Sequence, residues 1–260
     1  MSETSDPTTE GMTVLVPVQI LEGEQVPAAL IDVLASTPVV LLGYHVIPEQ
    51  TAPEQARASF GDQASEELED LAAAFRDAGG TVETRLVFTR DPTQTFERVA
   101  VDEAADAILL LNPAPSIDRI MVALSEGINT ERITELAASL ARGSDVTVSL
   151  FHVATADDEL ERGEQLLDDA RRSLVDKGVS PAWIDSEVLV SETPVKAIVD
   201  AASTGTDLVL LGESRPTVRE LVFGEPSERI ADRSLAPILV VRRLPALSDD
   251  ESEDEEEETK

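Results

Sequence analysis

The sequence repeats itself once, at a spacing of about 105 residues, and this repeat restricts the fold more than any other feature. Three pairs of segments show it: TVLVPVQI at 13–20 with DRIMVALS at 118–125, VVLLGYHVI at 39–47 with VTVSLFHVA at 146–154, and ADAILLLNPAP at 105–115 with TDLVLLGESRP at 206–216. The two histidines, His45 and His152, occupy the same place in the two copies. A period of this length is too long for a solenoid and predicts two tandem domains.

Each copy alternates apolar strands with amphipathic helices. Apolar runs predict strands near 13–18, 39–47, 81–89 and 107–111 in the first copy, and near 119–124, 146–153, 184–190 and 207–211 in the second. Helical spacing of apolar residues predicts helices between them, in the second copy near 129–141, 158–177 and 194–203. Continuously apolar strands that alternate with helices indicate an α/β fold, a parallel sheet covered on both faces.

The two copies differ after their fourth strand. The second continues through a loop, a predicted helix near 227–235 and a fifth strand, PILVV at 237–241, whereas the first passes from Leu111 almost directly into the next domain. We therefore predict four segments: a disordered N-terminal segment (1–11), a domain truncated after its fourth strand (12–115), a complete domain (116–243) and a disordered acidic tail (244–260).

The truncation leaves the fourth strand of the first domain with an open edge, which proteins usually cover or pair. We expect the strand at 237–241 to cover it within one chain, as an intrachain pseudo-dimer. Pairing of two chains through the same strand, as a homodimer, stays open as the alternative.

The charge of the chain disfavours several classes of partner. The formal net charge is −32, and −21 of it belongs to residues 12–243, so nucleic-acid binding through phosphates is not expected. Cysteine is absent, which excludes disulfides and thiolate chemistry. No run approaches the roughly 18 apolar residues of a membrane span, and residues 1–11 lack a signal-peptide pattern, so we expect a cytoplasmic protein that is not an integral membrane protein.

Taken together, these segments resemble a tandem universal stress protein. The resemblance covers about 12–243; the strand-two patterns YHV and FHV and the closing GEPSERIADRSLAPILVVRR carry it. It implies two doubly wound, Rossmann-like sheets of the adenine nucleotide alpha hydrolase-like type and a role in the stress response. The scarcity of lysine, three residues beside seventeen arginines, resembles proteins of salt-loving archaea, a haloarchaeal type; an ordinary acidic bacterial protein is the alternative. Molar salt screens such an acidic surface, because its Debye length is only about 3 Å.

The resemblance also points to a candidate nucleotide site in the loop at 210–229. Family members that bind ATP carry three spaced glycines there, the last followed by serine or threonine. In this sequence Gly212 fills the first position, Arg215 replaces the second glycine, and Gly224 comes one residue early and precedes Glu225. A phosphate needs exposed backbone N–H groups and close approach, so a carboxylate at 225 opposes it.

Other residues near this loop complete the candidate site. Ser125 stands where the family carries an aspartate after the first strand of the domain, and Ser227 is most simply the N-cap of the next helix. Residues 212–243 have a net charge of +1, so Arg215 could pair with a phosphate. The competing interpretation is that these arginines pair with neighbouring glutamates. The first copy, with NPAP at this point, should bind no phosphate in this way.

The remaining polar residues favour structural interpretations. His45 and His152 lie in separate copies without a second ligand at the usual spacing, so no metal site is predicted. Ser125 has no recognisable histidine base, and the carboxylate pairs Asp157–Asp158 and Asp168–Asp169 lie on predicted surface helices. The sequence therefore predicts no catalytic residues and no enzyme.

The functional hypothesis is a non-catalytic stress-response or regulatory module that acts by protein interaction, with an unknown regulatory protein as its partner. No cofactor is expected. Three alternatives stay open: a sensor of ATP or another nucleotide through 210–229, a weak nucleotide hydrolase, and a regulatory partner of a membrane transporter. Fold-level analogy supplies most of this hypothesis.

Overall fold

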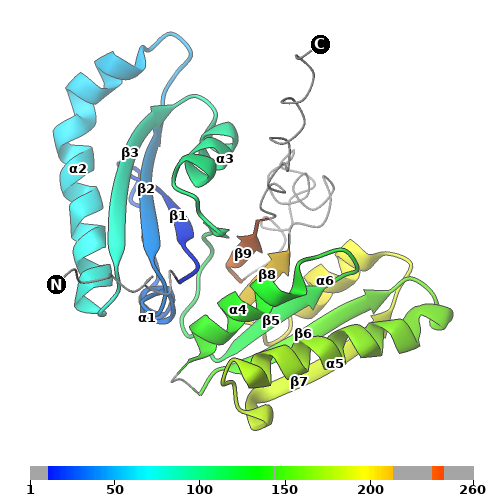
Figure 1. Cartoon of the computed structure of the whole chain (residues 1–260). Coiled ribbons are helices and arrows are strands. Elements are labelled where there is room, and N and C mark those ends of the chain that lie inside the picture. The colour runs from blue at the N-terminus through cyan, green and yellow to red at the C-terminus, as the bar shows by residue number, and fades with distance from the viewer. Residues whose placement is uncertain (1–10, 143–144, 213–235, 243–260) are drawn as a thin grey trace, which may run out of the picture.

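The computed structural model describes residues 11–142, 145–212 and 236–242, and in this part of the chain nine strands form one sheet (Figure 1). The strands are β1 (Val14–Gln19), β2 (Val39–Val46), β3 (Val82–Thr89), β4 (Ala107–Leu110), β5 (Arg119–Leu124), β6 (Thr147–Ala154), β7 (Ile184–Val190), β8 (Leu208–Gly212) and β9 (Ile238–Val241). The helices are α1 (Ala28–Leu34), α2 (Pro53–Asp77), α3 (Pro92–Asp102), α4 (Thr130–Ala141), α5 (Leu160–Asp176) and α6 (Pro194–Ala202).

The order of the strands is β3-β2-β1-β4-β9-β8-β5-β6-β7. Within each half every neighbouring pair is parallel, and the strands from β5 to β9 give the five-stranded doubly wound order that the sequence predicts for the second copy. The single antiparallel contact joins β4 to β9. The two halves therefore run in opposite directions across one continuous sheet.

Equivalent contacts in the two halves support the repeat. In the first half an Asp106 carboxylate oxygen accepts a hydrogen bond from the backbone N–H of Thr13 at 2.7 Å. In the second half a carboxylate oxygen of Asp207, at the equivalent point before the fourth strand, accepts the N–H groups of Asp118 and Arg119, each at 2.9 Å. The same residue type thus fastens the start of the first strand in both copies.

One apolar core crosses from the first half into the second. On one face of the sheet α1, α2, α4 and α5 cover the strands, and their buried side chains form a single cluster that includes Leu109 of β4 and Leu239 of β9. On the other face α3 and α6 cover separate, smaller clusters. The shared cluster means that the two halves bury apolar surface against each other through β4 and β9, which favours their association.

Strand β9 closes the edge that the truncation would leave open. Leu239 pairs with Leu109 on one side and with Leu210 on the other, so one strand from the second half completes both sheets. The expected intrachain pairing through 237–241 is confirmed by this ladder; the homodimer is not tested and stays a prediction.

Polar contacts reinforce the same junction. Arg242, directly after β9, donates through Nη1 to the carbonyl oxygens of Ala100 and Ala105, each at 2.8 Å. Arg132 of α4 forms a partly buried ion pair with Asp106 of the first half. These contacts are formed between halves rather than within them, so they fix how the halves sit against each other.

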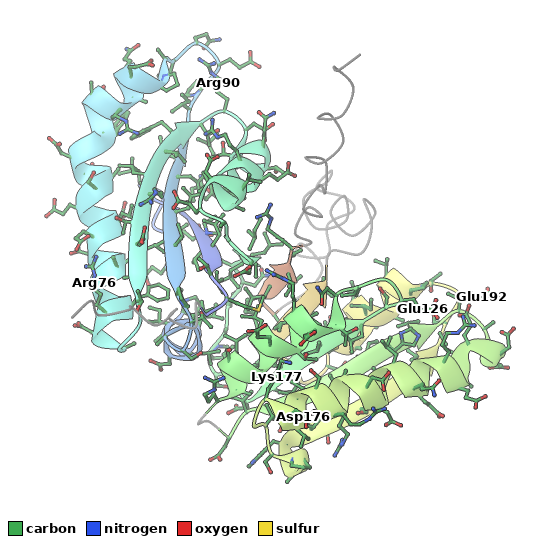
Figure 2. All side chains as sticks on the ribbon, viewed as in Figure 1. Arg76, Arg90, Glu126, Asp176, Lys177 and Glu192 are labelled. Atoms are coloured by element: carbon green, nitrogen blue, oxygen red, sulfur yellow. The ribbon has the colours of Figure 1, made fainter. Side chains whose placement is uncertain are left out.

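Charged side chains cover the outside of both halves (Figure 2). The ion pairs among them are mostly exposed, such as Arg76–Glu69 and Lys196–Asp200, and exposed pairs contribute little to stability because water and salt screen them. In the described residues no helix is long and apolar enough to cross a membrane. The predicted helix at 227–235 and the predicted acidic tail lie outside the described residues, as does all but the last residue of the predicted N-terminal segment.

Candidate functional site

The candidate site lies at the carboxyl edge of the second half, between β5 and β8. These two strands are parallel neighbours, with Ala123 opposite Leu211, so Ser125 after β5 and Gly212 at the end of β8 come to the same edge. The chain turns toward β6 from one of these strands and toward β9 from the other, which makes this the switch point where ligands usually bind in such sheets. The predicted meeting of Ser125 and Gly212 is confirmed.

An apolar side chain occupies the space in front of Gly212. The turn after β5 is closed by the Ile128 N–H, which is bonded to the Ser125 carbonyl at 3.4 Å, and Asn129 caps α4 by accepting the Arg132 N–H. This turn places Ile128 against Gly212 so closely that a methyl group at position 212 would overlap its Cγ2 and lie 3.1 Å from its Cδ1. Packing against Ile128 is therefore sufficient to explain why residue 212 is glycine.

The other predicted site residues are not placed. Arg215, Gly224 and Ser227 lie outside the described residues, so their role in a nucleotide site stays a prediction. The predicted pairing of the loop arginines with neighbouring glutamates falls on the same segment. Of the five candidate residues, the structure thus brings together Ser125 and Gly212.

The equivalent edge of the first half is occupied by carboxylates. The backbone N–H of Gln19, at the end of β1, donates to Glu24 at 2.5 Å, and the N–H of Leu21 donates to Glu67 of α2 at 2.6 Å. Leu21 has a positive φ of 69°, which an L-residue with a side chain rarely adopts. The backbone donors of Gln19 and Leu21 are thus bonded to the chain's own acids. That the first copy binds no phosphate stays a prediction.

Tyr44 is the titratable group most affected by this environment. Burial, and then the negative charge of Glu24, raise the pKa of Tyr44 to about 12. Its ring stacks edge-on against Phe96 of α3 at 4.9 Å between centroids. The phenol is therefore neutral at any ordinary pH, and it belongs to the packing between β2 and α3.

The two histidines differ in their surroundings although they are equivalent in sequence. The Nδ1 atom of His152 lies 2.9 Å from the carbonyl oxygen of Leu124, and the buried ring packs against Gly163 of α5. His45 instead lies between Phe60 and Phe88, with centroid distances of 5.9 and 6.1 Å, and its buried Nδ1 has no hydrogen-bond partner among the described residues. The contacts of His152 fit the structural role predicted from the sequence.

Gly163→Ala should destabilise the fold, because a Cβ at this position would lie 2.5 Å from Cδ2 of His152. We expect a loss of about 1–3 kcal/mol in the free energy of unfolding, typical of overpacking. Gly61→Ala in α2 is the matched control. Its Cβ would meet only Arg57 Cγ at 3.5 Å, so helix propensity should stabilise that variant by up to about 1 kcal/mol. If denaturant titrations gave changes in the free energy of unfolding of the same sign for both variants, this packing would be contradicted.

Among the described residues no group of three or more histidine, aspartate and glutamate side chains is arranged to hold a metal ion. The pairs Asp157–Asp158 and Asp168–Asp169 are exposed on the outside of the second half, as the sequence predicts. The side chains that matter most at the two edges, Ile128, Glu24 and Glu67, were not among the predicted site residues.

Comparison with known proteins assigns the second half to a family. Residues 116–242 match the model of the universal stress protein family. With the strand order and the position of the switch point, this match shows that these residues form a universal stress protein domain. No match is found among curated proteins.

Solved structures resemble the chain as a whole. A universal stress protein from Archaeoglobus fulgidus DSM 4304 is 16% identical, and the match covers 89% of this chain and 96% of that one with a TM-score of 0.62. A putative universal stress protein from Pseudomonas aeruginosa UCBPP-PA14 is 15% identical over 89% and 93%, with a TM-score of 0.50. The cytoplasmic domain of a prokaryotic cation chloride cotransporter is 14% identical over 88% and 95%, with a TM-score of 0.51. At these identities the likeness is one of fold, and it extends over both halves.

Proposed function

We propose that this chain is a non-catalytic regulatory module that acts by binding another protein, and that it binds no nucleotide between β5 and β8. The observation that carries the proposal is the position of Ile128. Its side chain packs on Gly212 at the switch point. A phosphate that bound there would need access to the backbone that Ile128 covers.

The acids of the first half support the same proposal. Glu24 and Glu67 accept the backbone N–H groups at the end of β1, so an anionic ligand there would have to displace two carboxylates from their donors. It would also meet the field of a strongly acidic chain. Among the residues that the structure describes, neither edge thus offers free, electropositive backbone to a polyphosphate.

The alternatives have less support in the described residues. A nucleotide sensor would need to move Ile128. A hydrolase would need a base, a nucleophile or a metal cluster in an arrangement that the sequence does not show. A regulatory partner of a membrane transporter is a special case of the proposed function. The cotransporter domain shares the fold at 14% identity, which does not favour that case over other partners.

Calorimetric titration with ATP in molar KCl tests the proposal. We expect no measurable heat of binding for the full chain, or a dissociation constant weaker than about 1 mM, which corresponds to about −4 kcal/mol. Because the Ile128 side chain would have to move aside, a micromolar constant would overturn the proposal. A still lower dissociation constant for ATP in Ile128→Ala would then identify the space in front of Gly212 as the binding site.

A further inference from the structure

The nine-stranded sheet has two edges, β3 and β7. The two edges differ in how many of their outward backbone groups are bonded to side chains. In a parallel pair each residue of the edge strand directs its N–H and C=O groups either inward to its neighbour or outward, in alternation. Thr81 and Thr89 accept bonds from the β2 side, so the odd-numbered residues of β3 face inward and Thr84 and Leu86 face outward.

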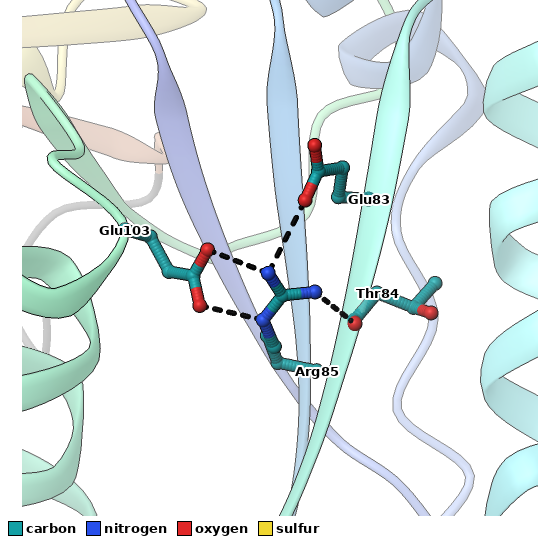
Figure 3. A network of polar contacts seen from close by, with 4 residues as sticks. All are labelled: Glu83, Thr84, Arg85 and Glu103. Atoms are coloured by element: carbon teal, nitrogen blue, oxygen red, sulfur yellow. Dashed lines mark hydrogen bonds and ion pairs between the residues drawn. The ribbon is translucent and has the colours of Figure 1, made fainter.

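The outward carbonyl groups of β3 are blocked by arginines. Arg85 donates through Nη1 to the Thr84 carbonyl oxygen at 2.9 Å, while Nε and Nη2 hold the two carboxylate oxygens of Glu103 at 2.5 and 2.8 Å (Figure 3). Arg57 of α2 donates to the Leu86 carbonyl oxygen at 3.1 Å. A strand that added to this edge would have to break both contacts, so β3 is protected against strand addition.

At the β7 edge the described residues block one position. Ser191 donates to Ala154 of β6, so the odd-numbered residues face inward and Ile184, Ser186 and Val188 face outward. Arg171 of α5 donates to the Ile184 carbonyl oxygen at 2.7 Å. Within the described ranges no other group bonds to the outward N–H and C=O of Ser186 and Val188, and these are the groups that an added strand would pair with.

A groove of about 660 Å³ runs beside this edge, and residues of β5, β6, β7 and α6 line it. In the first half the buried Leu42 and the stack of Tyr44 on Phe96 fill the corresponding face of the sheet. In the second half Ser149 stands at the position of Leu42, counted from the shared histidine, and α6 buries only Ala197 and Ala202. The smaller and more polar residues leave the groove open.

One acidic residue of the groove has no ion-pair partner among the described residues. Asp185 pairs with Arg119 and Asp200 pairs with Lys196, both at 2.8 Å. Glu187 also lines the groove, and in the described part of the chain no cation lies within ion-pair distance of it. The side chains of Glu187 and Leu189 share one face of β7, because side chains alternate along a strand, and both are exposed.

We propose that β7 is a docking edge for an extended segment of a partner protein in which lysine or arginine alternates with apolar residues. The segment adds to the sheet as a further strand, and its backbone pairs with Ser186 and Val188. On the groove side, a basic residue faces Glu187 and an apolar residue packs against Leu189. This inference rests on the proposed function and gives that function a surface and a class of partner.

A second copy of this chain fits the same edge poorly. Two β7 strands paired with each other would bring Asp185 and Glu187 of one copy close to the same acids of the other, and like charges on facing strands are destabilising. The acidic side chains therefore disfavour self-association while they favour a basic segment.

The test uses the full chain and a labelled peptide of four Lys-Val repeats, at the lowest KCl concentration that keeps the chain folded. We expect fluorescence anisotropy to report binding, and Glu187→Lys to weaken it at least about tenfold. Glu66→Lys, which makes the same charge change on an exposed position of α2, should leave the affinity unchanged. Hydrogen exchange at the amides of Ser186 and Val188 should slow when the peptide is added, while exchange at Thr84 and Leu86 should not.

Three results would overturn the proposal. The first is failure of the Lys-Val peptide to bind. The second is equal affinity for the Lys-Val peptide and for a version of it in which the backbone amides that would face β7 are N-methylated. The third is slow exchange at Ser186 and Val188 before peptide is added, together with a dimer by light scattering. An ATP titration of the same sample keeps the two proposals apart. Failure of the peptide alone removes the β7 edge, whereas tight ATP binding removes the proposed function.

Discussion

Leu239→Asp is expected to remove most of the stability of the chain. Leu239 is fully buried in the cluster that joins the halves, and it pairs with β4 on one side and β8 on the other. A carboxylate there loses its hydration and takes away an apolar contact from both halves at once. We expect a loss of more than about 4 kcal/mol, a large part of the 5–15 kcal/mol typical of a folded protein.

Urea titration followed by circular dichroism measures this loss. Val101→Asp, which introduces the same group at a side chain of α3 that is 63% exposed, is the control and should change stability by less than about 0.5 kcal/mol. Equal midpoints for Leu239→Asp and the unsubstituted chain would show that β9 is neither core nor junction.

The melting temperature should rise steeply with salt. The formal net charge is −32, of which −21 lies in residues 12–243, and repulsion among these charges opposes the compact state when screening is weak. Between about 0.1 M and about 3 M KCl the Debye length falls from about 10 Å to below about 3 Å. Each kcal/mol of stability recovered by screening raises the melting temperature of a chain of this size by about 2–4 °C. We expect screening to recover several kcal/mol, and therefore a total rise of more than about 10 °C.

Thermal unfolding followed by circular dichroism across this range of KCl tests the expectation. Sucrose at matched osmolality is the control, because it favours the compact state without screening charge and should give a smaller rise. A flat profile in KCl would contradict both the repulsion and the salt-adapted character inferred from the sequence.

Much of the fold could be predicted because it depends on periodic patterns. Apolar runs placed the strands of both copies, and alternation with helices indicated parallel sheets. The meeting of Ser125 with Gly212 followed from the strand order, since neighbouring parallel strands end at the same edge. Because the first copy lacks a fifth strand, the sequence predicted an open edge at its fourth strand. The structure shows this edge paired with the strand at 237–241.

The side chains at the carboxyl edges of the two halves could not be predicted in the same way. Ile128 lies in a short turn, where no periodicity indicates the direction of a side chain, and its contact with Gly212 depends on the register of β5 and β8. Glu67 reaches the end of β1 from α2, far away in the sequence. In the sequence Gly212 looks like part of a phosphate loop, whereas in the structure its contact with Ile128 is sufficient to explain a glycine.

The difference between the two histidines has a similar origin. The repeat gives His45 and His152 equal positions, and the sequence predicts equal structural roles. Gly163 leaves room for the ring of His152 against α5. His45 lies between two phenylalanines, and its Nδ1 has no hydrogen-bond partner in the part of the chain that the structure describes. A repeat thus predicts the backbone of both halves better than it predicts the contacts of equivalent side chains.

The central structural claim is that one strand of the second half closes the sheet of the first. The backbone N–H of Arg242 donates to the Asp106 carbonyl oxygen, so the carbonyl group of Asp106 faces β9. Because backbone groups alternate in direction from one residue to the next along a strand, the amides of Ile108 and Leu110 also point toward β9. Hydrogen exchange at these two amides is the most direct test. The claim predicts that they exchange only as the whole chain unfolds, as slowly as the amides of β5 and β8. Fast exchange at Ile108 and Leu110, with β5 and β8 still protected, would show that β4 is an open edge and would contradict the claim.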